Sequence, residues 1–257
     1  MIQLKSTREI EIMAEGGRIL AATIDRVASA VRPGVTTGEL DELAEAFIRS
    51  HPGAVPAFKG LYGFPGAICI SVNQEIVHGI PSRKRVLEGG DIIKLDAGVK
   101  FQGYYTDSAR SVPVGGVDEE SARLLDVTAR SLEAGIEAAR PGNHIGDIGH
   151  AVQQVVETAG FSVVRELVGH GVGAGPHEEP QVPNYGKPKR GLRLTPGLTI
   201  AIEPMVNVGG PATRTLADKW TVVTVDGSRS AHFEHTVAIT EGGPRVLTQL
   251  QAAPATV

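Results

Sequence analysis

The spacing of apolar residues in the first fifty positions predicts two helices. Apolar or small residues recur at alternating intervals of three and four, at Ile10, Met13, Gly17, Leu20, Ile24, Val27 and Val31. Ser6 and Glu9 form a capping box ahead of this run, and the expected helix ends at Arg32-Pro33-Gly34. A second capping box at residues 36–39 precedes another apolar stripe, at Leu40, Leu43, Ala44 and Phe47.

The same order of elements recurs in the second half of the chain. Helices are expected near residues 119–139 and 147–159, with a break at Pro141-Gly142 between them. Apolar runs predict strands near residues 67–72, 91–112, 161–168, 198–206, 220–225 and 231–239. Each half is therefore two helices followed by strands. Few residues separate the halves, which favours one continuous sheet with helices on one face over two separate domains.

Three short motifs recur in the same order in both halves, which indicates an internal repeat. They are Arg32-Pro33-Gly34 with Arg140-Pro141-Gly142, His78-Gly79-Ile80 with His170-Gly171-Val172, and the segment Leu87 to Asp96 with the segment Leu194 to Glu203. In the third pair an acid closes the predicted strand in each copy. The chain is interpreted as two copies of one unit.

Two acids interrupt the strands predicted at residues 91–112. Asp96 and Asp107 stand among β-branched, apolar and aromatic residues, where Asp is uncommon. In one interpretation Gly103 marks a hairpin turn and one or both acids face solvent; in the other they face the interior, where a carboxylate needs a cation or donors. The second half repeats the pattern with Glu203 and Glu234, and this repetition favours the second interpretation.

Composition and charge narrow the class of protein. The 257 residues are 41% hydrophobic with a net charge of −4 and show no basic patch for nucleic acid. No apolar run approaches the roughly 20 residues of a membrane helix, and no signal-peptide core follows the first residues, so a cytoplasmic protein is expected. Cys69 is the single cysteine, which excludes an internal disulfide and a cysteine-based zinc site.

Three histidines stand at the repeat motifs or in the loops beside them. His170 lies in Gly169-His170-Gly171-Val172-Gly173, where the glycines allow a close approach of backbone. His177 follows in the same loop, and His78 holds the matching position in the first half. The remaining histidines outside a motif are interpreted as surface or loop residues: His51, His144, His150 and His232.

Four carboxylates and an imidazole at one point cannot all stay ionised without a cation. Two divalent ions would balance four negative charges, and a water between them would lose its proton near neutral pH and attack a polarised carbonyl. Oxygen-rich ligation with one nitrogen favours manganese, iron or cobalt, with zinc as an alternative. The sequence therefore predicts a dinuclear hydrolase.

Taken together, these residues resemble those of the type I methionine aminopeptidases, from Thr7-Arg8-Glu9-Ile10 to Glu234-His235-Thr236. The resemblance implies an α+β pita-bread (creatinase/aminopeptidase-like) fold. In that fold two pseudo-symmetric α-α-β halves surround one curved, antiparallel-rich sheet with helices on its outer face. It also implies a single catalytic domain over residues 1–257, with repeat halves at about 1–114 and 118–250.

The resemblance assigns roles to the acids and to one histidine. The family's metal ligands fall on Asp96, Asp107, His170, Glu203 and Glu234. Asp107 and Glu234 are expected to bridge the two ions. Asp96 is expected to hold one ion, and His170 with Glu203 the other. Glu203 is also expected to take the proton from the bridging water.

The resemblance places further residues around the substrate. His78 and His177 are expected to donate hydrogen bonds over the scissile amide. Residues of the methionine pocket are expected at Tyr62, Phe64, Cys69 and Trp220. The chain departs from the family where Leu61-Tyr62-Gly63-Phe64-Pro65 replaces the usual Tyr-His-Gly-Tyr/Phe-Pro and where Pro176 replaces a common Phe. These departures affect the shape of the pocket.

The implied reaction is removal of the N-terminal methionine from nascent proteins and peptides whose second residue is small. The expected partners are such peptides and nascent chains, with transient association with the ribosome left open. A cytoplasmic monomer is expected, with no membrane and no direct nucleic-acid binding. The short form without an N-terminal extension resembles the bacterial members of the family.

Two alternatives remain from the sequence. A prolidase or proline-specific aminopeptidase shares the fold and the five ligands, but such enzymes usually carry a large extra N-terminal domain. A binding protein that keeps the fold without catalysis is the other alternative. Such relatives lose ligands, and this chain keeps all five.

Overall fold

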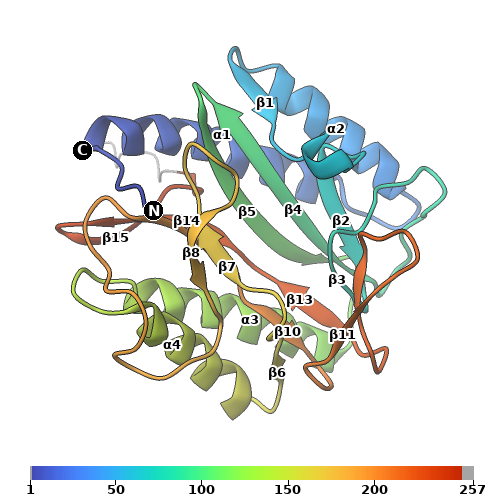
Figure 1. Cartoon of the computed structure of the whole chain (residues 1–257). Coiled ribbons are helices and arrows are strands. Elements are labelled where there is room, and N and C mark those ends of the chain that lie inside the picture. The colour runs from blue at the N-terminus through green and yellow to red at the C-terminus, as the bar shows by residue number, and fades with distance from the viewer. Residues whose placement is uncertain (1, 251–257) are drawn as a thin grey trace, which may run out of the picture.

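The computed structural model describes residues 2–250, which form helices packed on a set of antiparallel strands (Figure 1). The helices are α1 (Thr7–Ala30), α2 (Thr37–Arg49), α3 (Glu119–Ala138), α4 (Ile145–Thr158) and the short 3₁₀ helix η1 (Leu61–Gly63). Strands of the first half are β1 (Ala54–Pro56), β2 (Ile68–Val72), β3 (Glu75–Val77), β4 (Ile92–Phe101) and β5 (Tyr104–Pro113). Strands of the second half are β6 (Ser162–Val163), β7 (Gly169–Gly171), β8 (Glu178–Val182), β9 (Thr199–Ile202), β10 (Met205–Asn207), β11 (Thr213–Thr215), β12 (Val222–Thr224), β13 (Ser230–His232), β14 (His235–Thr240) and β15 (Gly243–Val246).

The two predicted capping boxes start α1 and α2. The Ser6 and Thr36 hydroxyls accept from the backbone N–H groups of Glu9 and Glu39, and each Glu carboxylate accepts from the N–H of its cap residue. In the second half, α4 begins two residues before the predicted position. Helices α1 and α2 pack on the strands of the first half, where α1 contacts β4 and β5, and α3 and α4 pack on those of the second half, where α3 contacts β10 and β13 (Figure 1).

The hairpin of β4 and β5 is the longest ladder in the described part of the chain. Phe101 pairs with Tyr104, and the two-residue turn between them has φ of 47° at Gln102 and 92° at Gly103. Left-handed values at both central residues match the right twist of the two strands. The predicted turn at Gly103 is therefore correct, but the acids on the two strands are buried, so the solvent-facing interpretation is wrong.

Several predicted strands are shorter than expected or broken. The strand predicted at 161–168 ends at Val163 because the chain bends there and carries Leu167 to the cavity described below. The strand predicted at 220–225 is confined to β12. The strand predicted at 198–206 breaks between β9 and β10, where Pro204 has no N–H to donate to a neighbouring strand.

The break between β9 and β10 faces a matching break between β13 and β14. Ile202 pairs with His235 on one side of the gap, and Met205 pairs with His232 on the other. Glu203 and Glu234 therefore lie in the two gaps, opposite one another. The strand predicted at 231–239 is likewise interrupted, between His232 and His235, and the two breaks together place two acids at one point.

The strands form four hydrogen-bonded sheets, and every strand pairing is antiparallel. Further backbone bonds join the halves: Glu234 N–H donates to Ala109 O at 2.9 Å, and the Ser108 hydroxyl donates to Glu234 O at 2.8 Å. The first half's β5 thus holds the chain that carries Glu234. The arrangement is the predicted α+β class.

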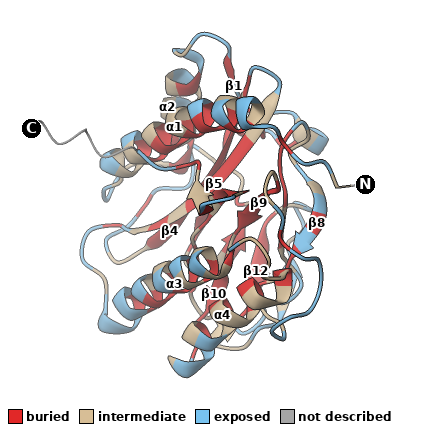
Figure 2. Cartoon of the chain, turned by 90° about the vertical axis from the view of Figure 1, so that its left-hand side faces the viewer, coloured by how far each residue is buried: buried red, intermediate tan, exposed pale blue. Residues whose placement is uncertain are grey.

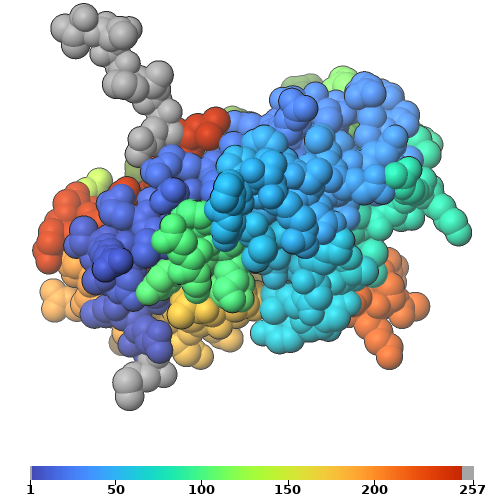
Figure 3. Space-filling view, turned by 90° about the horizontal axis from the view of Figure 1, so that it is seen from above, coloured from blue at the N-terminus to red at the C-terminus, as the bar shows by residue number. Residues whose placement is uncertain are grey.

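Apolar side chains fill the space between the helices and the strands. Figure 2 shows most of the strands buried, with β8 as an exposed exception, while the helices carry exposed residues on their outer faces. Residues of α1 and α2 cover the face seen in Figure 3. Among the described residues, no helix is long and apolar enough to cross a membrane.

Candidate metal centre and substrate pocket

A cavity of about 340 Å³ lies among the strands, and every site residue predicted from the sequence lines it. These residues are Tyr62, Phe64, Cys69, His78, Asp96, Asp107, His170, His177, Glu203, Trp220 and Glu234. The lining also includes residues that the sequence did not single out for the pocket: Phe58, Leu61, Val77, Leu167, Val168, Met205 and His232. Leu61 belongs to the segment 61–65 that departs from the family; the other apolar members belong to no motif, and only the fold brings them together.

The register of β4 and β5 places two of the acids on one face. Asp96 pairs with Ala109, and Gly98 pairs with Asp107. Residues directly opposite in an antiparallel pair share a face, as do residues two apart on one strand. Asp96 and Asp107 are therefore diagonal neighbours on the same face, where Gly98 makes room for Phe58, whose Cε1 would lie 2.9 Å from a Cβ at that position.

Burial raises the pKa of all four acids. The pKa of Asp96 rises to about 7 through burial alone. Burial, and then the charge of Asp107, raise the pKa values of Glu203 and Glu234 well above their usual range. Burial and then the charge of Asp96 do the same for Asp107. Without a cation, the four carboxylates cannot all be ionised at neutral pH.

His170 is a neutral imidazole with one nitrogen free. Its Nδ1 lies 2.9 Å from the carbonyl oxygen of Gly171 and donates to it, and burial lowers its pKa to about 4. Nε2 therefore keeps its lone pair, and it lies 3.4 Å from Oε1 of Glu203. Two acceptors at this distance call for a cation between or beside them.

The donor atoms fit a metal ion. Asp107, His170 and Glu234 each offer one ligand atom, and these atoms lie within 4.8 Å of one another. Oδ1 of Asp107 and Oε1 of Glu234 are buried without a hydrogen-bond partner among the described residues. Buried carboxylate oxygens are costly when they are left without a donor or a cation. The set of oxygens and one nitrogen suits a divalent cation.

Two further histidines face the same cavity from its mouth. The ring centroids of His170 and His177 are 4.5 Å apart. Tyr62 stacks on the His177 ring, with centroids 6.2 Å apart and an angle of 16° between the ring planes. Burial lowers the pKa of His177, and burial followed by the nearby His177 lowers that of His78. Both imidazoles are therefore neutral at pH 7, and each can donate one N–H.

The apolar end of the cavity is built from aromatic rings and sulfur. Phe64 and Trp220 meet edge to face with centroids 5.2 Å apart, and Trp220 meets His78 in the same manner at 6.5 Å. Cys69 is buried beside them, opposite Asp96 on the neighbouring strand. A soft, apolar slot of this kind suits a thioether side chain.

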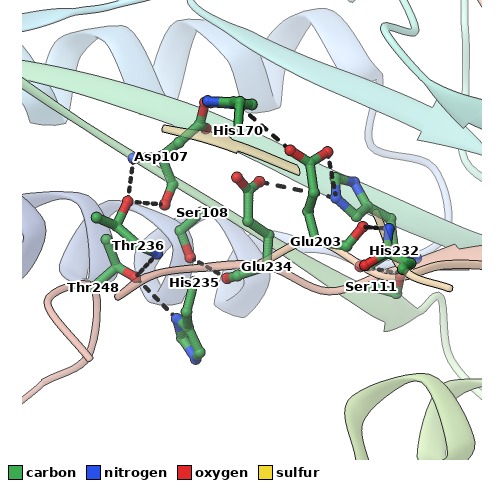
Figure 4. A network of polar contacts seen from close by, with 11 residues as sticks. Asp107, Ser108, Ser111, His170, Glu203, His232, Glu234, His235, Thr236 and Thr248 are labelled. Atoms are coloured by element: carbon green, nitrogen blue, oxygen red, sulfur yellow. Dashed lines mark hydrogen bonds and ion pairs between the residues drawn. The ribbon is translucent and has the colours of Figure 1, made fainter. Parts of the chain in front are cut away.

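The interpretation of His232 as a surface or loop residue is wrong. Its side chain is 1% exposed and lines the cavity, because it stands two residues before Glu234 and shares its face (Figure 4). The sequence signal was this spacing of two along a strand. The other three histidines of that group, His51, His144 and His150, are partly exposed and lie outside the cavity lining.

Comparison with known proteins was made by family model, by sequence and by structure. The model of metallopeptidase family M24 matches residues 11–241. Methionine aminopeptidase 1 of Bacillus subtilis is 54% identical over 250 residues, which cover 97% of this chain and 100% of that protein. The solved methionine aminopeptidase of Thermotoga maritima aligns with a TM-score of 0.95 at 44% identity, covering 97% of this chain and 100% of that one. The prolidase of Pyrococcus furiosus shares the fold, with a TM-score of 0.77 at 23% identity, covering 97% of this chain and 66% of that one.

Proposed function

The chain belongs to the metallopeptidase family M24, and we propose that it removes the N-terminal methionine of peptides and newly made proteins by metal-assisted hydrolysis. It is an aminopeptidase of the methionine aminopeptidase type, with the pita-bread fold. The observation that carries the mechanism is the meeting of three buried carboxylates, the partly buried carboxylate of Glu203 and one neutral imidazole beside an apolar slot.

The five acidic and imidazole side chains would hold two divalent cations, which we propose to be manganese, iron or cobalt, with zinc as the alternative. Asp107 and Glu234 would bridge the cations, since each has a buried oxygen with no other partner. Asp96 would hold one cation. His170 and Glu203 would hold the other, since their ligand atoms are adjacent.

When bound, the cations would polarise the scissile carbonyl and lower the pKa of a water held between them. Glu203 accepts the proton of the attacking water and passes it to the leaving amine. His177 donates its N–H to the carbonyl oxygen, where negative charge develops as the water attacks. His78 donates to the substrate backbone.

The methionine side chain would fill the slot lined by Phe64, Cys69 and Trp220. The second residue of the peptide must then pass beside the carboxylates and histidines at the mouth of the cavity. Small side chains fit such a passage, while overpacking costs about 1–3 kcal/mol. Because about 1.4 kcal/mol corresponds to a tenfold change, sterics alone predict about ten- to a hundredfold discrimination.

Nascent chains would be the physiological substrates, in the cytoplasm, where transient contact with the ribosome would bring the enzyme to them. We propose that it acts as a monomer. A prolidase activity is the second candidate by fold. The aromatic and thiol lining of the slot favours methionine over it.

A peptide series tests the proposed substrate. Protein stripped of metal and reloaded with manganese, cobalt, iron or zinc is assayed on Met-Gly, Met-Ala, Met-Ser, Met-Val, Met-Ile and Met-Lys peptides and on Xaa-Pro peptides. Release of methionine should be fastest for small second residues. Equal cleavage of Met-Ala and Met-Lys would rule out the narrow passage, and preferential cleavage of Xaa-Pro would identify a prolidase.

A further inference from the structure

His232 is a buried histidine at the centre that the ligand assignment leaves without a role. It is 1% exposed, and neither ring nitrogen has a hydrogen-bond partner among the described residues. A buried imidazole left without partners loses the free energy of its hydrogen bonds with water. Such a group calls for an explanation, and the groups around it supply one.

The carboxylates of Glu203 and Glu234 flank one nitrogen of the ring. Nε2 lies 3.9 Å from Oε2 of Glu203 and 3.8 Å from Oε2 of Glu234 (Figure 4). His170 approaches the other carboxylate oxygen of Glu203, so the two imidazoles lie at opposite oxygens of one acid. Carboxylates accept hydrogen bonds and cannot donate them when ionised. An N–H on Nε2 is therefore the complementary group.

Hydrogen bonds to β5 fix the backbone of His232 beside the acids. Its N–H donates to the Ser111 hydroxyl at 2.8 Å, and that hydroxyl donates to its carbonyl oxygen at 2.8 Å. Two residues farther along, Glu234 is held by β5 through Ala109 and Ser108. One strand of the first half thus sets the positions of His232 and Glu234 together.

We propose that His232 is a positioning residue of the metal centre: at 3.8 and 3.9 Å its Nε2 is just beyond hydrogen-bond distance of Glu234 and Glu203, and a small movement of either carboxylate would let Nε2–H donate to it and fix the orientation in which both bind metal. The inference rests on the proposed ligand set. Removal of a side chain that hydrogen-bonds to a metal ligand without binding the metal itself typically lowers metal affinity or activity by about 10- to 100-fold. In this role His232 itself binds no cation.

The test compares three substitutions at one position. His232→Leu keeps the approximate volume and removes the donor, whereas His232→Gln and His232→Asn keep an N–H. Dissociation constants for manganese are measured by calorimetry on metal-stripped protein, and kcat and KM are measured with Met-Ala-Ser. We expect His232→Leu to weaken metal binding by about 10- to 100-fold and to lower kcat with little change in KM. His232→Gln should recover most of both.

Three results would overturn the inference. Unchanged metal affinity and kcat in His232→Leu would remove any role for the N–H. Loss of one bound equivalent in His232→Leu and His232→Gln alike, with the other equivalent bound at full affinity, would make His232 a ligand. Equal losses in all three variants, with lowered melting temperatures, would leave only a packing role.

His144→Leu, outside the cavity lining, is the matched control and should bind manganese as the native protein does. If all five ligands proved dispensable for metal binding, the proposed function itself would fail, which is a separate outcome.

Discussion

His177 makes the sharpest single-residue prediction. Its neutral ring, held between His170 and Tyr62, faces the cavity and can donate to an oxygen that gains negative charge. Loss of one such donor typically lowers kcat by about a hundred- to a thousandfold. His177→Ala should therefore reduce kcat strongly while its metal content, measured by atomic emission, stays near that of the native protein. Metal loss in proportion to activity would instead make His177 a ligand.

The metal-binding acids could be predicted from the sequence because acids recur at equivalent positions of its two halves. Asp96 and Glu203 occupy equivalent positions of the two halves, and both stand where an acid is unexpected. His232 was not predicted as a site residue because it belongs to no repeated motif, although it stands two residues before Glu234 in the strand predicted at residues 231–239. Side chains two residues apart on a strand point to the same face, so the position of Glu234 could have indicated that His232 also faces the site.

At the scale of elements, the glycine after His170 gives a test of how the strands hold the site. A Cβ on Gly171 would lie 2.3 Å from the carbonyl oxygen of Glu179, which is backbone and cannot rotate away. Overpacking of this kind costs about 1–3 kcal/mol, occasionally more. Gly171→Ala should lower the urea midpoint and weaken manganese binding, because β7 must move and carry His170 with it.

Gly175 supplies the matched control in the same loop region. A Cβ there would meet its nearest neighbour, Cγ of Glu178, at 3.6 Å, an ordinary contact. Gly175→Ala should leave the urea midpoint and the metal affinity close to those of the native protein. If both variants behaved alike, the close approach of β7 and β8 would have no part in placing His170.

Helices were predictable to within one or two residues at their ends, and short strands were not. Capping boxes at Ser6 and Thr36 are local signals, readable from four residues. The gaps that place Glu203 and Glu234 depend on pairing between strands about thirty residues apart in sequence. Pro204 was the one local sign of a gap, and the opposite gap before β14 carries no such sign.

At the scale of the whole molecule, stability and metal are linked through pH. Burial raises the folded-state pKa of Asp96 from 3.8 to about 7, so the metal-free folded protein binds more protons than the unfolded chain between these values. Its free energy of unfolding should therefore fall as pH rises from about 4 to 7. Bound metal needs the deprotonated ligands and should add stability as pH rises.

Urea unfolding of metal-stripped protein at pH 5 and pH 7.5, with and without manganese, measures this linkage. The metal-free protein should be less stable at the higher pH, and manganese should reverse the order. Asp96→Asn, which cannot ionise there, should weaken the pH dependence of the metal-free protein. A metal-free stability that rises from pH 5 to pH 7.5 in step with the metal-loaded one would contradict the account.

The central claim is that the acids of the two halves form one metal centre that releases methionine. The most direct measurement titrates metal-stripped protein with manganese and follows metal binding by calorimetry and release of methionine from Met-Ala-Ser in the same samples. The account predicts no release before metal is added, release that rises with bound metal, and loss of both in Asp107→Asn. Undiminished release by the stripped protein, or native binding and release in Asp107→Asn, would contradict it.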